Sequence, residues 1–410
     1  MIDIRRGDNL DILPILAPRS VQCVVTSPPY FGLRDYGIAP SVWPAIEYAP
    51  MAGIPPISVP AQVVCLGLES DPIAYVAHLV HVFRLLRDVM RDDGTVWLNL
   101  GDSYAANRGY QVADSKHKDV GNSHGAAVPS GLKQKDLMMI PARVALALQA
   151  DGWYLRNQAI WHKPNAMPES VTDRLTNDYE PVYLLAKSAR YYFDQNAIRT
   201  EHTSHIERQS KPATPRGTYA SDGRSLGREQ QSESFHPAGR NRRTVWTIPT
   251  QALRAEHYAP MPEALVEPCI LAGSAAKACE HCGAAWVRLV ETDNPRASDD
   301  YRNRAATPKD AASGGMAGRG SPTSGLAKPG WRKDGSKTVT TTGFAPACAC
   351  AGNTGAVSSI VLDPYFGSGT TGRVAIKYGR RCIGIDKNDS YIDMSDRRTN
   401  GVQVHMEAYT

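Results

Sequence analysis

Two short motifs, far apart in the chain, carry residue types that could do chemistry. The first is Thr26-Ser27-Pro28-Pro29-Tyr30. The apolar run before it, residues 21–25, predicts a buried strand, and two consecutive prolines must end that strand and prevent a helix. The resulting stiff loop offers a hydroxyl, a main-chain carbonyl and an aromatic ring, which suits a planar group bearing an exocyclic amine. Taken alone, the motif is more typical of an ordinary proline-rich turn.

The second motif is a glycine-rich turn. It reads Asp363-Pro364-Tyr365-Phe366-Gly367-Ser368-Gly369-Thr370. A strand is expected before it, a helix after it, and the next strand ends at Asp386. Glycines let the backbone approach a ligand, and an acid that closes the following strand is placed to hold a ribose hydroxyl pair. The turn lacks the lysine of a P-loop and the third glycine of a dinucleotide fingerprint. For Asp386, a simple strand-end turn residue is the alternative.

Four of the eight cysteines form two close pairs. Cys279 and Cys282 make a Cys-x-x-Cys pair, and Cys348 and Cys350 follow later in the chain. Two such pairs are typical of a structural zinc site with four cysteine ligands, in which His281 can replace one cysteine. Four reduced thiols, or a redox pair at Cys279 and Cys282, are the alternatives.

Bulk composition sets wide limits on the class of protein. A chain of 410 residues can form two or three domains, and a formal net charge of +5 is compatible with a polyanionic partner. No apolar stretch approaches the length of a membrane span, and the N-terminus has no apolar core. We therefore expect a soluble, cytoplasmic protein that makes no membrane contact.

Alternating strand and helix patterns surround both motifs and predict a three-layer α/β domain. Strands are expected at 21–25, 95–100, 153–161, 181–185, 191–193, 244–248, 359–362 and 381–385. Helices are expected to begin at Pro72, Leu137, Pro262 and Thr371, and the first of them to end at Asp93-Gly94. The stretch between Tyr30 and Gly67 is expected to be loop.

Two polar segments interrupt this pattern. Residues 201–245 contain eight Lys/Arg and five Asp/Glu, and residues 291–345 contain nine Lys/Arg and six Asp/Glu. Neither composition can bury a core, so both are expected to be loops that could contact phosphates, with solvated linkers as the alternative.

Together the two motifs resemble those of the β-class DNA amino-methyltransferases that use S-adenosylmethionine. The order, catalytic loop first and cofactor loop last, is similar to the permutation of that class. The stretches 6–13, 161–170 and 261–266 agree with it, and the resemblance covers about 1–200 and 244–400. It implies a Rossmann-like methyltransferase domain with a mainly parallel sheet, to which the cysteine pairs add a small zinc-stapled insertion.

The resemblance also implies roles for individual residues. The residues that would hold a target base extruded from double-stranded DNA are Ser27, Pro28, Pro29 and Tyr30. The cofactor-binding residues would be Asp8, Thr26, Asp363, Phe366, Gly367, Gly369, Thr370 and Asp386. Asp386 would bind the ribose and Asp8 the adenine amine, although a helix N-cap is the alternative for Asp8.

The expected domain boundaries follow from these assignments. A catalytic half covers 1–200, a candidate target-recognition segment 201–245, a helix 246–275, a zinc-knuckle insertion with a basic arm 276–352, and the cofactor half 353–410.

The target base depends on one residue. Ser27 stands where many adenine-modifying relatives have Asp, which favours the N4 amine of cytosine over the N6 amine of adenine. Two further function classes are a catalytically silent nucleic-acid-binding protein and a protein-glutamine methylase, which would carry Asn at this position. The sequence shows no nuclease motif, so a restriction endonuclease partner is compatible with it without being indicated.

Overall fold

The computed structural model describes residues 1–105, 128, 131–201, 239–251, 260–293, 338–350 and 355–404. It consists of two compact units. Unit 1 comprises Met1–Ile198, Arg243–Val287 and Pro346–Thr410, and unit 2 comprises Arg199–Arg242 and Arg288–Ala345. Among the described helices, none has the length and hydropathy needed to cross a membrane.

Unit 1 is built on an eight-stranded sheet. In spatial order its strands are β1 (Ile2–Arg6), β16 (Arg381–Asp386), β15 (Ile360–Asp363), β2 (Val21–Thr26), β7 (Met90–Asn99), β9 (Tyr179–Ala186), β8 (Tyr154–His162) and β10 (Val245–Thr247). Only β9 runs antiparallel to its neighbours. The predicted mainly parallel sheet is therefore confirmed. Seven strands end at one edge of the sheet, which is also the edge where β9 begins.

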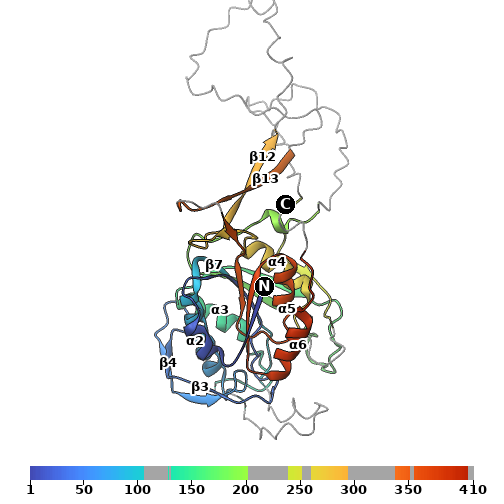
Figure 1. Ribbon diagram of the computed structural model, residues 1–410. Helices are drawn as coiled ribbons and strands as arrows, with labels where there is room; N and C mark the ends of the chain where they lie inside the picture. Colours follow the sequence, from blue (N-terminus) through green and yellow to red (C-terminus); the bar gives the residue numbers. More distant parts are fainter. Residues whose placement is uncertain are drawn as a thin grey trace, which may run out of the picture. The chain divides into compact units, whose positions relative to one another are not determined.

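Helices cover both faces of this sheet (Figure 1). Helices α2 (Pro72–Val89) and α3 (Ile140–Ala150) lie on one face, and α4 (Glu263–Gly273), α5 (Thr370–Lys377) and α6 (Asp389–Thr399) on the other. The short α1 (Asn9–Ile12), η1 (Leu13–Ile15) and η3 (Asn196–Ile198) complete the helical elements of the described chain.

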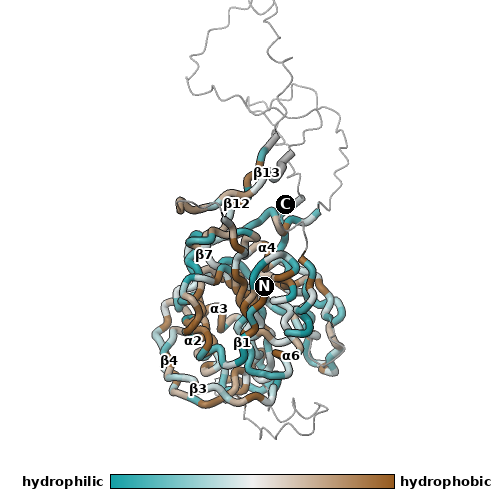
Figure 2. Tube along the Cα trace, in the orientation of Figure 1, coloured by the Kyte–Doolittle hydropathy of each residue, from teal (hydrophilic) through white to brown (hydrophobic). Residues whose placement is uncertain are grey.

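The central strand β2 shows why helices must cover both faces of the sheet. All six of its residues are buried, and neighbouring side chains point to opposite faces. Val24 packs in the core with α2 and α3, whereas Cys23 and Val25 pack in the core with α4 and α5. In Figure 2 the hydrophobic stretches gather around α2 and α3 beside the sheet.

Helix α2 begins as the sequence predicts but ends earlier. The side chain of Asp71 accepts a hydrogen bond from the amide of Ala74 (3.0 Å), and Pro72 occupies the first turn. The helix ends at Val89 and strand β7 starts at Met90, so the prediction that Asp93-Gly94 would end the helix is wrong. The reason is tertiary, because Met90 is fully buried and already pairs with Val21 of β2.

Two further secondary-structure predictions are corrected. The stretch expected to be loop contains two small sheets, in which β3 (Ser41–Trp43) pairs with β6 (Gln62–Val64) and β4 (Ile46–Tyr48) with β5 (Ile57–Val59). The buried, exposed, buried alternation of β3 and β4 is the two-residue period of a strand. Residues 191–193, expected to be a strand, are not one, and β9 pairs with β7 and β8.

Unit 2 is described only in part. Its described portion contains most of the two-stranded sheet of β12 (Trp286–Asp293) and β13 (Thr338–Pro346). Arg288 lies 5.0 Å from the ring centroid of Phe344 and donates to Thr341 (3.0 Å). The greater part of both predicted basic segments, 202–238 and 294–337, lies outside the described residues.

Gly369, at the start of α5, is required by packing. Its φ is +78°, in the left-handed region, and a Cβ built on it would lie 2.7 Å from Cβ of Ser395 in α6. The glycine therefore lets α6 approach the glycine-rich turn.

Replacing Gly369 should consequently destabilise the fold. Gly401 is a matched control, because its φ is +77° but no atom lies within 4 Å of its built Cβ. Gly401→Val should cost only the left-handed strain of about 1–2 kcal/mol. Gly369→Val should cost about 1–3 kcal/mol more through overpacking. Urea unfolding of both variants measures the difference, and equal stabilities would contradict this packing role.

Candidate active site

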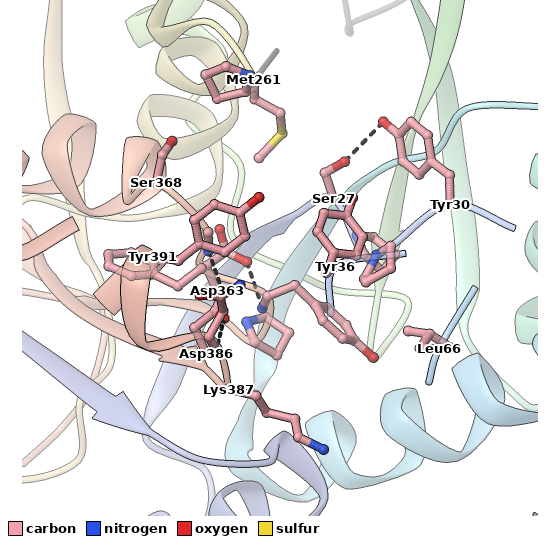
Figure 3. Close-up of a pocket in the computed structure, with 18 of the residues that line it drawn as sticks. Ser27, Tyr30, Tyr36, Leu66, Met261, Asp363, Ser368, Asp386, Lys387 and Tyr391 are labelled. Carbon is pink, nitrogen blue, oxygen red and sulfur yellow. Dashed lines mark hydrogen bonds between the residues drawn. The ribbon is translucent and has the colours of Figure 1, made fainter. Parts of the chain in front are cut away.

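One cavity of about 360 Å³ lies at the carboxyl edge of the sheet in unit 1 and is lined by both sequence motifs. Ser27 and Tyr30 contribute from the loop after β2, and Asp363 and Asp386 from the ends of β15 and β16. Figure 3 shows these two groups on facing sides of the pocket. The edge where parallel strands end is where α/β proteins commonly place ligands.

Strand pairing brings the two motifs together. Strands β2 and β15 are parallel neighbours, with Leu362 opposite Val24. Directly beyond that pair, the Thr26 hydroxyl donates to Oδ1 of Asp363 (2.7 Å). Thr26 is fully buried and does not line the cavity, so it contacts the pocket only through this carboxylate.

Asp363 is a buried carboxylate held by neutral donors. It accepts hydrogen bonds from Thr26, from the hydroxyl of Thr371 (2.8 Å) and from the amide of Tyr365 (3.1 Å). Burial raises the pKa of Asp363 to about 7, and the threonine hydrogen bonds oppose that rise. A cation placed in the cavity beside this carboxylate would favour its charged form.

Asp386 is tied to the glycine turn. Its Oδ2 accepts from the amide of Gly367 (2.7 Å) and its Oδ1 from the amide of Asn388 (2.8 Å). Burial raises the pKa of Asp386, while these backbone donors lower it. Gly367 has a φ of +49°, lines the cavity, and would direct a Cβ into largely open space. Of the two glycines, Gly367 is thus the one whose backbone faces the pocket.

Asp8 is both an N-cap and a cavity residue. Its Oδ1 caps α1 by accepting from the amide of Leu10 (3.0 Å). Its Oδ2 accepts from the hydroxyl of Ser41 (2.6 Å) and from Nζ of Lys387 (2.9 Å). Burial alone would raise the pKa of Asp8, but these hydrogen bonds lower it below its usual value. The N-cap that the sequence allowed for Asp8 is therefore present in the structure.

Phe366 and Thr370 complete the cofactor motif, and both line the cavity. The Phe366 ring is 3% exposed and packs on Gly384 of β16, where a Cβ would lie 2.4 Å from it. Phe366 therefore anchors the turn to the sheet as well as forming part of the pocket wall.

The loop after β2 is fixed by its own side chains. Ser27 donates to the Tyr30 hydroxyl (2.9 Å), as the dashed line in Figure 3 shows. The Tyr30 ring packs on Gly101, and the carbonyl of Pro29 accepts from Tyr75 (2.8 Å). Pro28 and Pro29 also line the cavity, so all four residues predicted to hold the target base lie at its wall.

Sequence reasoning missed three polar residues beside this loop. Asn99 ends β7, Lys163 follows β8, and Glu180 is the second residue of β9. All three line the cavity, because the antiparallel strand β9 begins at the edge where β7 and β8 end. Tyr30 donates to Oε2 of Glu180 (2.8 Å), and Lys163 forms an ion pair with Glu180. The only available signal was their position at strand ends.

Sequence reasoning also missed several other lining residues. They are Tyr36, Trp43, Lys387 and Tyr391. The rings of Tyr36 and Tyr391 meet edge to face with centroids 6.4 Å apart. These aromatic side chains give the pocket an apolar part of its wall.

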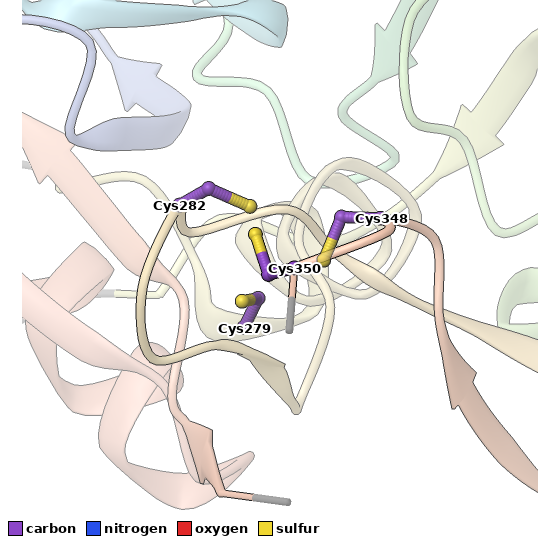
Figure 4. Close-up of side chains that lie close together, drawn as sticks. All are labelled: Cys279, Cys282, Cys348 and Cys350. Carbon is purple, nitrogen blue, oxygen red and sulfur yellow. The ribbon is translucent and has the colours of Figure 1, made fainter. Parts of the chain in front are cut away.

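The four predicted zinc ligands lie together elsewhere in unit 1. The Sγ atoms of Cys279, Cys282, Cys348 and Cys350 are all within 4.8 Å of one another (Figure 4). The amide of Cys282 lowers the pKa of the Cys279 thiol, whereas Cys282 and Cys348 raise the pKa of Cys350. A second negative charge is thus opposed in the absence of a cation. The His281 ring lies 3.6 Å from Glu280 and is not part of the group.

Comparisons with known proteins agree with this geometry. The model of the DNA methylase family matches residues 21–278 and 354–397. The type II methyltransferase M.Cfr9I of Citrobacter freundii is 32% identical over 401 residues, which cover 98% of this chain and 88% of that protein. M.SmaI of Serratia marcescens is 31% identical over 393 residues, 96% of this chain and 88% of that protein.

Among solved structures, the chain is similar to the PvuII DNA methyltransferase, described as cytosine-N4-specific. The TM-score is 0.49 at 13% identity, over 99% of this chain and 89% of that one. The family match spans both motifs of the cavity. The chain also matches the two type II methyltransferases over most of their length. The chain therefore belongs to the DNA methylase family and is a DNA amino-methyltransferase.

Proposed function

We propose that this enzyme methylates the N4 amine of cytosine in double-stranded DNA, with S-adenosylmethionine as the methyl donor. The observation that carries the proposal is that one cavity is lined by the glycine turn with its carboxylates on one side and by the loop around Ser27 on the other. A donor and an acceptor bound in these two halves would be adjacent, and such positioning supplies much of the rate of a two-substrate reaction.

The cofactor half suits S-adenosylmethionine, which supplies an electrophilic methyl group on a sulfonium and also carries an ammonium group. Asp363 is a buried carboxylate whose hydrogen-bond partners are all neutral, so a cationic ligand fits it. We assign the methionine end to Asp363 and Gly367, the ribose to Asp386, and the adenine to the neighbourhood of Asp8. Phe366 and Thr370 form the wall, and Thr26 and Gly369 act indirectly, through Asp363 and α6.

The target half suits an exocyclic amine. The lone pair of such an amine is delocalised into the ring, so the amine is a poor nucleophile. Hydrogen bonds from its N–H groups to Ser27 Oγ and to the carbonyl of Pro28 would favour a pyramidal nitrogen whose lone pair faces the methyl group. Tyr30 and the prolines would contact the extruded base. No strong base is needed before the transfer, because the amine becomes acidic only once it is methylated.

Zinc and the basic segments belong to the same proposal. We infer that the cysteine group holds a structural zinc ion, because four sulfur atoms at this separation match a tetrahedral site. In that arrangement zinc joins the two ends of the insertion 276–352, whose basic arm would contact DNA phosphates, as would segment 201–245. In this chain the loop with Ser27 precedes the glycine-rich turn. We infer that this is the permuted order of the β class.

Asp363 generates a pH prediction. Because its pKa is about 7, a fall in pH below 7 protonates the carboxyl group and removes the partner of the cofactor's ammonium. Affinity for S-adenosylmethionine should therefore drop roughly tenfold per pH unit below 7, with proton release on binding. Calorimetry at pH 5.5, 6.5 and 7.5 measures this, with Asp363→Asn as the variant whose affinity should be weak and flat. A wild-type affinity that does not change with pH would contradict the assignment.

The metal generates a second prediction. Purified protein should contain about one zinc ion per chain, and Cys348→Ser should lower both the zinc content and the melting temperature. Cys65→Ser is the control and should keep its zinc, because Cys65 lies outside the group. Elemental analysis decides the matter, and metal-free protein that is folded and active would count against a zinc site.

The target base generates a third prediction, which depends on Ser27 alone. Duplex DNA methylated by the enzyme, digested to nucleosides and separated by mass, should yield N4-methylcytosine. Detection of N6-methyladenine alone would overturn the choice of base and leave the enzyme class in place.

A further inference from the structure

Glu180 is a carboxylate that the mechanism above does not use, although it lies next to the catalytic loop. Its side chain is 14% exposed. Oε2 accepts from the Tyr30 hydroxyl (2.8 Å) and from Nδ2 of Asn99 (3.0 Å), and Oε1 is paired with Lys163. Because Ser27 donates to the same Tyr30 hydroxyl (2.9 Å), a continuous line of hydrogen bonds joins Ser27 Oγ to Glu180.

We propose that Glu180 is the final acceptor of the proton that leaves the methylated amine, and that the hydroxyl groups of Ser27 and Tyr30 relay this proton. The proposal deepens the proposed function and rests on it, since Ser27 must contact the amine. It assigns a role to a residue that neither sequence motif contains.

The step balances in atoms and charge. The amine lone pair forms the N–CH₃ bond while the S–CH₃ bond breaks, which moves the positive charge from sulfur to nitrogen. The nitrogen then gives a proton to Ser27 Oγ as Ser27 gives its own to Tyr30, and Tyr30 gives its own to Oε2 of Glu180. The products are a neutral methylamine, neutral thioether and protonated Glu180, and both hydroxyl groups are restored.

The surroundings of the relay favour this direction. Burial and the nearby Glu180 charge raise the pKa of Tyr30 well above its usual value, so Tyr30 passes a proton on rather than becoming an anion. Asn99 Oδ1 lies 3.1 Å from the same hydroxyl and Asn99 Nδ2 donates to Oε2 of Glu180 (3.0 Å), so Asn99 holds the hydroxyl beside the carboxylate. A chain of hydroxyl groups ending on a carboxylate is also polarised, which makes Ser27 Oγ a better acceptor before transfer.

The charged neighbours of Glu180 bear on how it loses its proton after each turnover. Lys163 is the cation paired with Glu180, its side chain is 19% exposed, and its Nζ lies 4.6 Å from the centroid of the Trp161 ring. At the adjoining strand ends, the His162 ring faces Asp178 at 3.7 Å. The partly exposed Lys163 side gives the protonated Glu180 a route to solvent after each turnover.

The test is single-turnover methylation of duplex DNA at saturating cofactor, which removes the pH dependence of cofactor binding. Glu180→Gln keeps the shape and an oxygen acceptor for Tyr30 but cannot take up a proton. It should react about 100-fold more slowly than wild type, with unchanged affinity for DNA and cofactor.

Four further variants decide the interpretation. Tyr30→Phe keeps the ring but breaks the relay, so it should resemble Glu180→Gln, and the double variant should be no slower than either single one. Glu180→Asp should recover part of the rate. Glu267→Gln, which removes a carboxylate of α4 outside the cavity, should match wild type.

Two results would overturn the relay. One is Glu180→Gln reacting within threefold of wild type. The other is Glu180→Asp reacting as slowly as Glu180→Gln, since that pattern indicates a structural role. If Glu180→Gln does not fold, Tyr30→Phe decides by the same criterion. A wild-type enzyme that fails to methylate DNA would instead refute the proposed function, so the two failures are distinguishable.

Discussion

The hydrogen bond between Thr26 and Asp363 joins the ends of two strands that are 337 residues apart in the chain, and the cavity depends on it. It forms because β2 and β15 are parallel neighbours and both end at this point. A slip of one residue in their register would turn the side chains of one strand to the opposite face. The burial of every residue of β2 against two helical layers makes such a slip costly, so the core of the fold sets the geometry of the site.

Charge is distributed unevenly over the two halves of the cavity. Asp363 and Asp386 are held by uncharged donors, and each has its pKa raised by burial. A cationic cofactor would relieve that burial cost, which couples binding of the donor to the protonation state of the site. On the side of Ser27 and Tyr30, Glu180 is paired with Lys163, so these two charges compensate each other.

Features that depend on local sequence were predictable. Both motifs, the strands that precede them and the cysteine pairs were identified from short stretches whose spacing has a direct physical meaning. Features that depend on distant pairing were not. Glu180 reaches the site only because β9 runs antiparallel to β7, and Gly369 contacts α6 rather than the pocket.

Asp8 shows a further limit of prediction from the sequence. Its sequence position allowed either an N-cap or a ligand contact, and the structure has the N-cap and also places the side chain at the cavity wall. The end of α2 was misplaced because the propensity of Asp93-Gly94 to break a helix was overridden by strand pairing at Met90. At the end of α2 a tertiary contact decided between two locally reasonable structures, whereas the structure around Asp8 is compatible with both of its possible roles.

The joining of donor and acceptor sites in one cavity is tested most directly by methyl transfer from labelled S-adenosylmethionine to duplex DNA by wild type and Ser27→Ala, with cofactor affinity measured in parallel. Ser27 lies in the target half, so Ser27→Ala should bind the cofactor as wild type does and transfer the methyl group about 100-fold more slowly. Transfer at the wild-type rate, or a loss of cofactor binding that accounts for the slower rate, would contradict this division of the cavity.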